Sequence, residues 1–234
     1  MPDPGLLRAY AHKIRQFGYN ARLYLLSLII SGIAAGIFGL LFNFYILSLG
    51  YDEALLGQLL TTSNTTALLT ALPGGYLIDL IGRKRALLLA GILSTFAVLG
   101  LIGWHSVLGL YVISVGLGLG QSLNDVTLGP FLMENSSEAE RTYLFSLSFG
   151  VHILAAFVGN WLGGQIPQWA GTWFQLDATA VSAYRTALIL VVALSFLSLI
   201  PLLRLRVVPK RHDTPADRLA PLRYARQHRS CWGN

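Results

Sequence analysis

Six long apolar stretches dominate this sequence, and each is long enough to cross a bilayer as a helix. A hydrocarbon core about 30 Å thick requires about 20 predominantly apolar residues per helical span. No alternation of apolar and polar residues indicates the strands of a barrel. The pattern therefore predicts an all-α polytopic membrane protein with six transmembrane helices. We expect these helices to cover residues 23–49, 56–80, 86–104, 108–133, 143–166 and 184–203.

The composition supports a membrane protein. Hydrophobic residues make up 54% of the chain and charged residues only 12%, whereas soluble domains carry about 25% charged residues. The first apolar stretch is too long for a signal peptide, and we expect it to be an uncleaved first span. Cys231 is the single cysteine, so an internal disulfide is excluded and no metal cluster is expected.

The distribution of Lys and Arg predicts the orientation. With the N-terminus inside, 16 of the 17 cations lie on the inner side and only Arg185 lies outside. Because cytoplasmic loops are enriched in Lys and Arg, we expect a protein of the plasma membrane with both termini cytoplasmic. The chain then divides into an N-terminal segment (1–22), a transmembrane domain (23–203) and a basic tail or truncated linker (204–234). We expect no nucleic-acid binding by this tail, since cations next to a membrane span are common.

A short turn between the second and third predicted helices has an unusual composition. A positive-inside loop explains its cations, but not an acid and two glycines at this spacing. The first glycine allows another helix to approach closely, and the second can adopt the backbone angles of a tight reversal. The residues concerned are Gly75, Asp79, Gly82, Arg83, Lys84 and Arg85.

This turn resembles the loop between helices 2 and 3 of the major facilitator superfamily, which has the pattern Gly-x-x-x-Asp-Arg-x-Gly-Arg-Arg/Lys. Leu80 departs from the pattern, because the family commonly has a cation there. The resemblance implies that the loop belongs to a charge relay that steadies one conformation of a transporter. Glu134 and Arg141 have the family-like spacing of relay partners, and we expect them to cluster with Asp79, Arg83 and Arg85.

The resemblance implies a fold as well. It implies the N-terminal half of a major facilitator transporter, built from two three-helix repeats in inverted relation. The segment from Gly159 to Gly164 resembles the family's Gly-Pro-x-x-Gly-Gly element, with Asn160 in place of proline. That element marks exporters, so its altered form does not favour drug efflux. The chain is then a fragment, a truncated reading frame, or a half that pairs with a missing C-terminal half or a second copy.

Polar residues within the predicted spans mark a candidate pathway, because such residues are costly in a bilayer. Asp125 and His152 are expected at similar depth on antiparallel neighbouring helices, where they could handle protons as a pair. The alternative is that these side chains only form hydrogen bonds across packed helices. The candidate pathway residues are Asn43, Asn64, Gln121, Asn124, Asp125 and His152.

The remaining helices give weaker signals. The third and sixth are rich in leucine and lack a polar stripe, so we expect them to face lipid or to be peripheral. Two glycine pairs, Gly32 with Gly36 and Gly159 with Gly163, predict faces of close helix approach, either within this chain or between copies.

We therefore expect secondary active transport of a small solute, coupled to protons, with the lipid bilayer and a small-molecule substrate as partners. The alternative is a non-transporting six-span interaction or assembly protein, which would not need Asp125 and His152 on polar faces. We expect no enzyme activity and no cofactor, because neither Gly-x-Ser-x-Gly nor His-Glu-x-x-His occurs.

Overall fold

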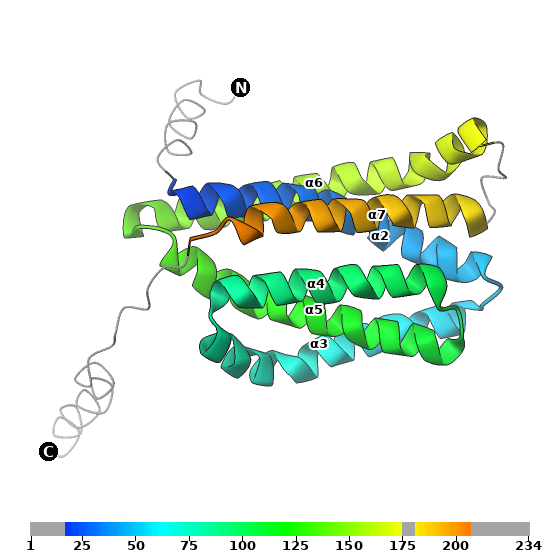
Figure 1. Cartoon of the computed structure of the whole chain (residues 1–234), viewed down its shortest axis with the longest axis horizontal. Coiled ribbons are helices and arrows are strands. Elements are labelled where there is room, and N and C mark those ends of the chain that lie inside the picture. Colours follow the sequence, from blue (N-terminus) through cyan, green and yellow to red (C-terminus); the bar gives the residue numbers. More distant parts are fainter. Residues whose placement is uncertain (1–16, 175–180, 207–234) are drawn as a thin grey trace, which may run out of the picture.

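The computed structural model describes residues 17–174 and 181–206, so the first 16 residues, Asp177 and the tail from residue 207 lie outside the described part. Within the described part, every regular element is an α-helix, and the helices run roughly along one common axis (Figure 1). The prediction of an all-helical protein is confirmed. The helices are α2 (Tyr19–Ser48), α3 (Glu53–Ile81), α4 (Arg83–Gly103), α5 (Val107–Glu134), α6 (Glu138–Phe174) and α7 (Val181–Leu203).

Five of these helices are long and apolar enough to cross a membrane, namely α2, α4, α5, α6 and α7. The exception is α3, because residues 61–66 are all Thr, Ser or Asn. Four hydroxyl groups of this helix donate to carbonyl oxygens one turn earlier, at 2.7–2.8 Å; the donors are Thr61, Thr62, Thr66 and Thr70. Such bonds lower the cost of placing hydroxyl groups in lipid. A sixth span formed by α3 stays a prediction.

The helix ends lie close to the predicted ones except in α6, which we expected to cover residues 143–166. It begins at Glu138 and continues through Pro167 to Phe174, so it extends into the segment that we expected to separate it from the next helix. A proline removes one backbone hydrogen bond and can bend a helix without ending it. The segment between α5 and α6 is correspondingly reduced to residues 135–137.

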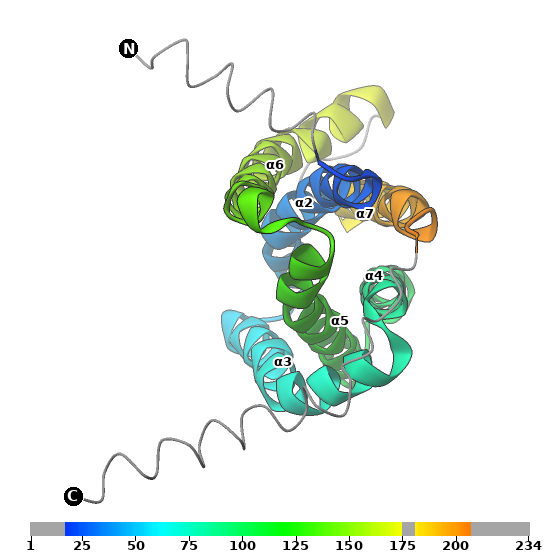
Figure 2. The same cartoon turned by 90° about the vertical axis from the view of Figure 1, so that its left-hand side faces the viewer.

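The helices form two groups of three. In one group, α6 and α7 pack along α2; in the other, α3 and α4 pack along α5. Figure 2, which looks along the bundle, shows the two groups side by side. The main direct contact between them joins α4 to α7, where the rings of Phe96 and Phe196 meet edge to face with centroids 6.4 Å apart.

Glycine residues determine the close approach of α2 and α6. A Cβ atom at Gly36 would overlap the carbonyl oxygen of Ala156, and a Cβ atom at Gly159 would overlap that of Ile33. The two backbones therefore touch directly. Lipid provides no hydrophobic drive between helices, so close van der Waals contact is a main source of their association. The two predicted glycine faces meet each other within this chain.

The second group has a comparable contact on α5. A Cβ atom at Gly118 would overlap the carbonyl oxygen of Ser63 in α3, and one at Gly120 would lie 3.1 Å from the carbonyl oxygen of Ala90 in α4. Glycines that the sequence places inside an apolar helix thus allow α3 and α4 to approach α5 closely.

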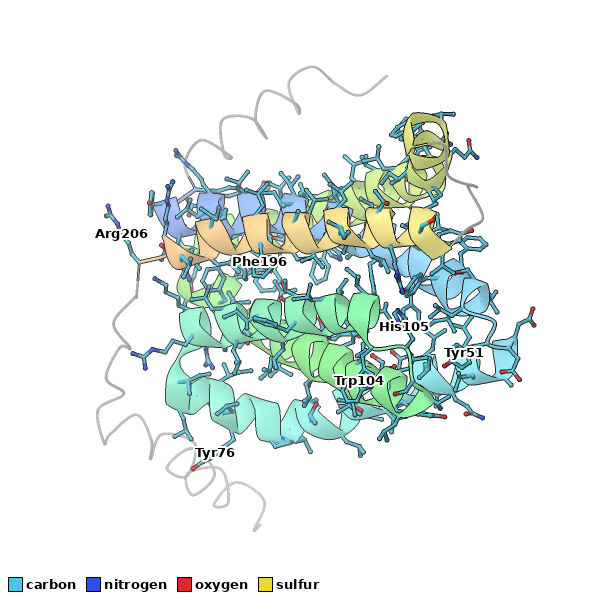
Figure 3. All side chains as sticks on the ribbon, turned by 45° about the vertical axis from the view of Figure 1, so that its right-hand side comes forward. Tyr51, Tyr76, Trp104, His105, Phe196 and Arg206 are labelled. Carbon is cyan, nitrogen blue, oxygen red and sulfur yellow. The ribbon has the colours of Figure 1, made fainter. Side chains whose placement is uncertain are left out.

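A polar network joins the two groups at the end of the bundle opposite Gly82, where Figure 3 shows Tyr51 and His105 near each other. The Tyr45 hydroxyl lies 2.9 Å from His105 Nε2, and the Arg185 guanidinium lies 3.2 Å from the same nitrogen. The Tyr51 hydroxyl donates to the His105 carbonyl oxygen at 2.6 Å. Because a guanidinium only donates, His105 Nε2 can take part in the contact with Arg185 only as an acceptor. The network links α2 and α7 to the connection between α4 and α5.

The glycine contact leads to a stability prediction. Gly36→Ala should destabilise the fold by about 1–3 kcal/mol, because the added methyl group overpacks the α2–α6 contact. Gly39→Ala is the matched control in the same helix, since a Cβ atom there meets nothing within 4 Å; its greater helix propensity should leave stability equal or higher. Thermal unfolding in detergent, followed by circular dichroism, compares the two. Equal unfolding midpoints would contradict the packing argument.

The polar network leads to a second prediction. His105→Ala should lower stability by about 1–3 kcal/mol, because the buried Tyr45 hydroxyl loses its shortest hydrogen bond. Its remaining contacts, with the Leu101 carbonyl oxygen at 3.4 Å and Arg185 Nε at 3.5 Å, are long. Val107→Ala, at an exposed position two residues later, should unfold close to the wild-type temperature. The same unfolding experiment measures both variants. A His105→Ala protein as stable as the control would show that the network does not hold the two groups together.

Candidate functional site

A cavity of about 520 Å³ is lined by residues from all six helices. Small-molecule sites commonly have volumes of about 300–1,000 Å³. In the described part of the chain, no three His, Cys, Asp or Glu side chains are grouped so as to hold a metal ion. The polar residues that line the cavity, apart from Tyr24, are Ser27, Ser31, Ser63, Asn64, Ser94, Thr95, Ser114, Gln121, Asn124, Asp125, His152, Ser195 and Ser198.

We expected the third and sixth helices to face lipid or to be peripheral, but both also contribute to the lining of the cavity. One face of α4 contributes Ser94 and Thr95 to the cavity, and one face of α7 contributes Ser195 and Ser198. These small side chains are dispersed among leucines, so they produce no polar stripe in the sequence. These side chains line the cavity because α4 packs against α7, and the two helices are far apart in the chain.

Five of the six candidate pathway residues line this cavity; Asn43 of α2 does not. The five side chains are exposed in the single chain, so the cavity opens to the surface. They come from three helices, α3, α5 and α6. The structure thus brings together residues that are up to 88 positions apart, from Asn64 to His152.

Asp125 and His152 face the same cavity, but they are not on neighbouring helices as we expected. Between α5 and α6 there is little contact, because α6 packs along α2. The His152 ring lies where Gly32 of α2 leaves space, since a Cβ atom there would be 3.4 Å from Nδ1. Within the described part, Asp125 and His152 form no hydrogen bond or ion pair with each other. Asp125 Oδ1 has a long contact of 3.5 Å with the amide of Asn124, and the Gln121 side chain one turn earlier is a second hydrogen-bond partner of the carboxyl group.

Several hydroxyl groups in the lining already donate their protons to backbone carbonyl oxygens. Ser27 donates to Ser198 at 2.8 Å, Thr95 to Gly91 at 2.7 Å, and Ser198 to Ser195 at 2.7 Å. A hydroxyl group has a single proton but two lone pairs. These oxygens can therefore act only as acceptors toward a molecule in the cavity.

The turn at Gly82 forms a separate charged site at one end of the bundle. Gly82 is the single residue between α3 and α4 and has φ 87°. Arg83 pairs with Asp79 at 2.7 Å and with Glu134 at 3.2 Å, at the surface. Such exposed pairs contribute about 0–1 kcal/mol each, so they bias an arrangement more than they stabilise the fold. A Cβ atom at Gly75 would be 3.7 Å from α5, an ordinary contact, so crowding within the described part does not require glycine there.

The other cations at this end do not all join that cluster. Lys84 Nζ donates to the carbonyl oxygens of Leu203 and Leu205, both at 2.7 Å, and so caps the end of α7. Arg85 forms no ion pair with the described residues. Arg141 Nε is buried and has no hydrogen-bond partner among them. Of the expected relay cations, the structure brings only Arg83 to both acids.

Sequence reasoning missed Lys84 as a cap, and it also missed Asn20. The Asn20 amide donates to Asn135 Oδ1 at 2.7 Å and to the Arg206 carbonyl oxygen at 2.9 Å, and its oxygen accepts from the Arg206 N–H at 2.9 Å. The Arg206 guanidinium lies 4.8 Å from the centre of the Tyr19 ring, at the end of the bundle marked by Arg206 in Figure 3. Such long-range contacts of single side chains leave no periodic signal in a sequence.

Comparison with known families agrees with this architecture. The profile of the Major Facilitator Superfamily matches residues 24–232. Curated protein sequences give no match. The profile match covers nearly the whole chain, including all six helices and the turn at Gly82, and it confirms the resemblance seen in that turn. The chain belongs to the major facilitator superfamily of membrane transporters.

Proposed function

We propose that this chain forms one half of the pathway of a proton-coupled secondary transporter for a small solute. The observation that carries the proposal is the cavity lined by all six helices, which combines a carboxylate, Asp125, with an imidazole, His152. Both groups can exchange protons in a pathway through the membrane. Family membership supports the transport role.

The helix packing supports two inverted three-helix repeats. If α2, α3 and α4 correspond to α5, α6 and α7, the pairing of α2 with α6 corresponds to that of α5 with α3. Likewise, the pairing of α2 with α7 corresponds to that of α5 with α4. These four are the most extensive pairings in the bundle. The backbone of α6 lies close to Gly36 of α2, and in the second repeat the backbone of α3 lies similarly close to Gly118 of α5.

We assign the Gly82 end of the bundle to the cytoplasm of a plasma-membrane protein. Arg83, Lys84 and Arg85 lie there, whereas Arg185 belongs to the first turns of α7 at the opposite end. This distribution follows the positive-inside rule. Both termini are then cytoplasmic. We also assign a conformational role to the pairing of Arg83 with Asp79 and Glu134, since it joins the start of α4 to the ends of α3 and α5.

A second six-helix unit would complete the pathway, either a C-terminal half or another copy of this chain. The side chains of Asn64, Gln121, Asn124, Asp125 and His152 are exposed in the single chain. Polar groups that face hydrocarbon without partners are unfavourable by several kcal/mol. A partner that covers this opening would remove that cost.

The transport proposal is tested by Asp125→Asn in the completed transporter. The amide cannot carry a proton, so accumulation driven by a pH gradient should be abolished while substrate exchange stays measurable. Uptake into proteoliposomes, with and without the gradient, provides the measurement. His152→Ala should shift the pH optimum without abolishing uptake. Uptake by Asp125→Asn that still follows the gradient would remove Asp125 from the coupling step.

The partner proposal is tested by crosslinking in membranes. In a Cys231→Ser background, a single cysteine at Asn64 should crosslink to a second copy or to a co-expressed second half, because this position borders the open cavity. A single cysteine at Ile189, an exposed apolar position on α7, is the control and should stay uncrosslinked. Equal crosslinking at both positions, or none at Asn64 in a chain that transports substrate, would contradict the proposal.

A further inference from the structure

The cavity has no permanently positive side chain in its lining. Its lining residues include no Lys or Arg, and Asp125 is its one carboxylate. The other titratable lining groups are Tyr24 of α2 and His152 of α6, while α3, α4 and α7 contribute none. An anion that entered would lose its hydration without meeting a permanently charged cation, whereas a cation would meet Asp125.

Asp125 is also available to a ligand, because it forms no ion pair within the described part of the chain. The nearby acids at the Gly82 end differ in this respect: Asp79 and Glu134 both pair with Arg83. A carboxylate within a membrane span needs a counter-charge, a proton or hydrogen-bond donors. Its partners on the same helix, Asn124 at 3.5 Å and Gln121, are neutral amides, so neither supplies a counter-charge.

Three hydroxyl groups of the uncharged lining favour the same kind of ligand, whereas its amide groups can serve either charge. The hydroxyl groups of Ser27, Thr95 and Ser198 donate to backbone carbonyl oxygens and present only lone pairs to the cavity. Oxygen acceptors of this kind suit the N–H groups of an ammonium ion and the polarised C–H groups of a quaternary one. They offer nothing to the oxygens of a carboxylate, sulfonate or phosphate.

The far part of the cavity is aromatic. Phe38 and Phe42 line it, with ring centroids 5.4 Å apart. Phe42 belongs to the same apolar cluster as Ile113, the neighbour of Ser114 in α5. The stretch of α5 from Ser114 to Asp125 corresponds to about 16 Å at 1.5 Å per residue. The cavity thus has an apolar aromatic end and a carboxylate end.

From these four features we propose that the transported solute is a small organic cation, with its positive group beside Asp125 and its apolar part toward Phe38 and Phe42. The inference rests on the proposed transport function and adds the charge class of the substrate. It concerns residues of this chain alone, so binding can be measured on the purified chain without any transport assay.

The test compares two probes of similar size and opposite charge. Equilibrium dialysis of the full chain in lipid nanodiscs should show binding of phenyltrimethylammonium and at least tenfold weaker binding of benzenesulfonate, with empty nanodiscs as blank. Asp125→Asn should weaken phenyltrimethylammonium binding at least tenfold, and Asp125→Glu should restore most of it. Glu53→Gln, an exposed acid that does not line the cavity, should bind like the wild type.

A second variant, which should gain binding of the anionic probe, gives a result that does not depend on replacing Asp125. Gln121→Lys places a cation one turn before Asp125 on the same lining, so benzenesulfonate binding should rise and phenyltrimethylammonium binding should fall. Equal binding of both probes by the wild type, or unchanged cation binding by Asp125→Asn, would overturn the inference. Cation binding by a completed transporter that moves no solute would overturn the proposed function instead. Proton-driven uptake of anions only would retain the function and overturn the cation assignment.

Discussion

The backbone contact between α2 and α6 is the constraint on which the arrangement of the site depends. It exists because neither Gly36 nor Gly159 has a side chain where the two helices cross. In lipid, close packing at small residues is a main force that selects one helix partner over another. Once α6 is held against α2, it cannot lie along α5, although only three residues separate the two helices in the chain. The place of His152 beside Gly32 follows directly.

The cavity lies between the two groups of helices, and it results from the same helix pairing. Each group of three is held together by small residues at its central helix, so the groups are compact. Between the groups the lining combines serine, threonine and amide side chains with alanine, glycine, valine, leucine and phenylalanine, and together they leave the space unfilled. The aromatic contact of Phe96 with Phe196 and the network around His105 join the groups at their edges. The two groups are therefore joined beside the open cavity by contacts that are local and few.

The sequence was sufficient for features that depend on the bilayer and on local backbone chemistry. Long apolar stretches gave the helices, and Gly82 marked the reversal between α3 and α4. It was insufficient where one side chain meets a distant backbone atom. Asn20 contacts Arg206 across most of the chain, and nothing near either residue indicates this. The neighbours of α6 were also wrong in the prediction, because chain order suggested α5 whereas glycine packing selects α2. For Asp125, the spacing within one helix predicted its polar face, but not which other helices share the cavity.

Lys84 has a consequence for how the protein is made. In the sequence it is one of three adjacent cations that orient the neighbouring helices. This role is fulfilled as soon as α3 and α4 have entered the membrane. Its ammonium group nevertheless binds carbonyl oxygens 119 and 121 residues later in the chain. The ribosome must therefore finish the last helix before Lys84 reaches its final partners. Until then this charge remains hydrated at the surface of the bilayer, and its capture by the end of α7 marks the moment at which the six-helix unit is complete.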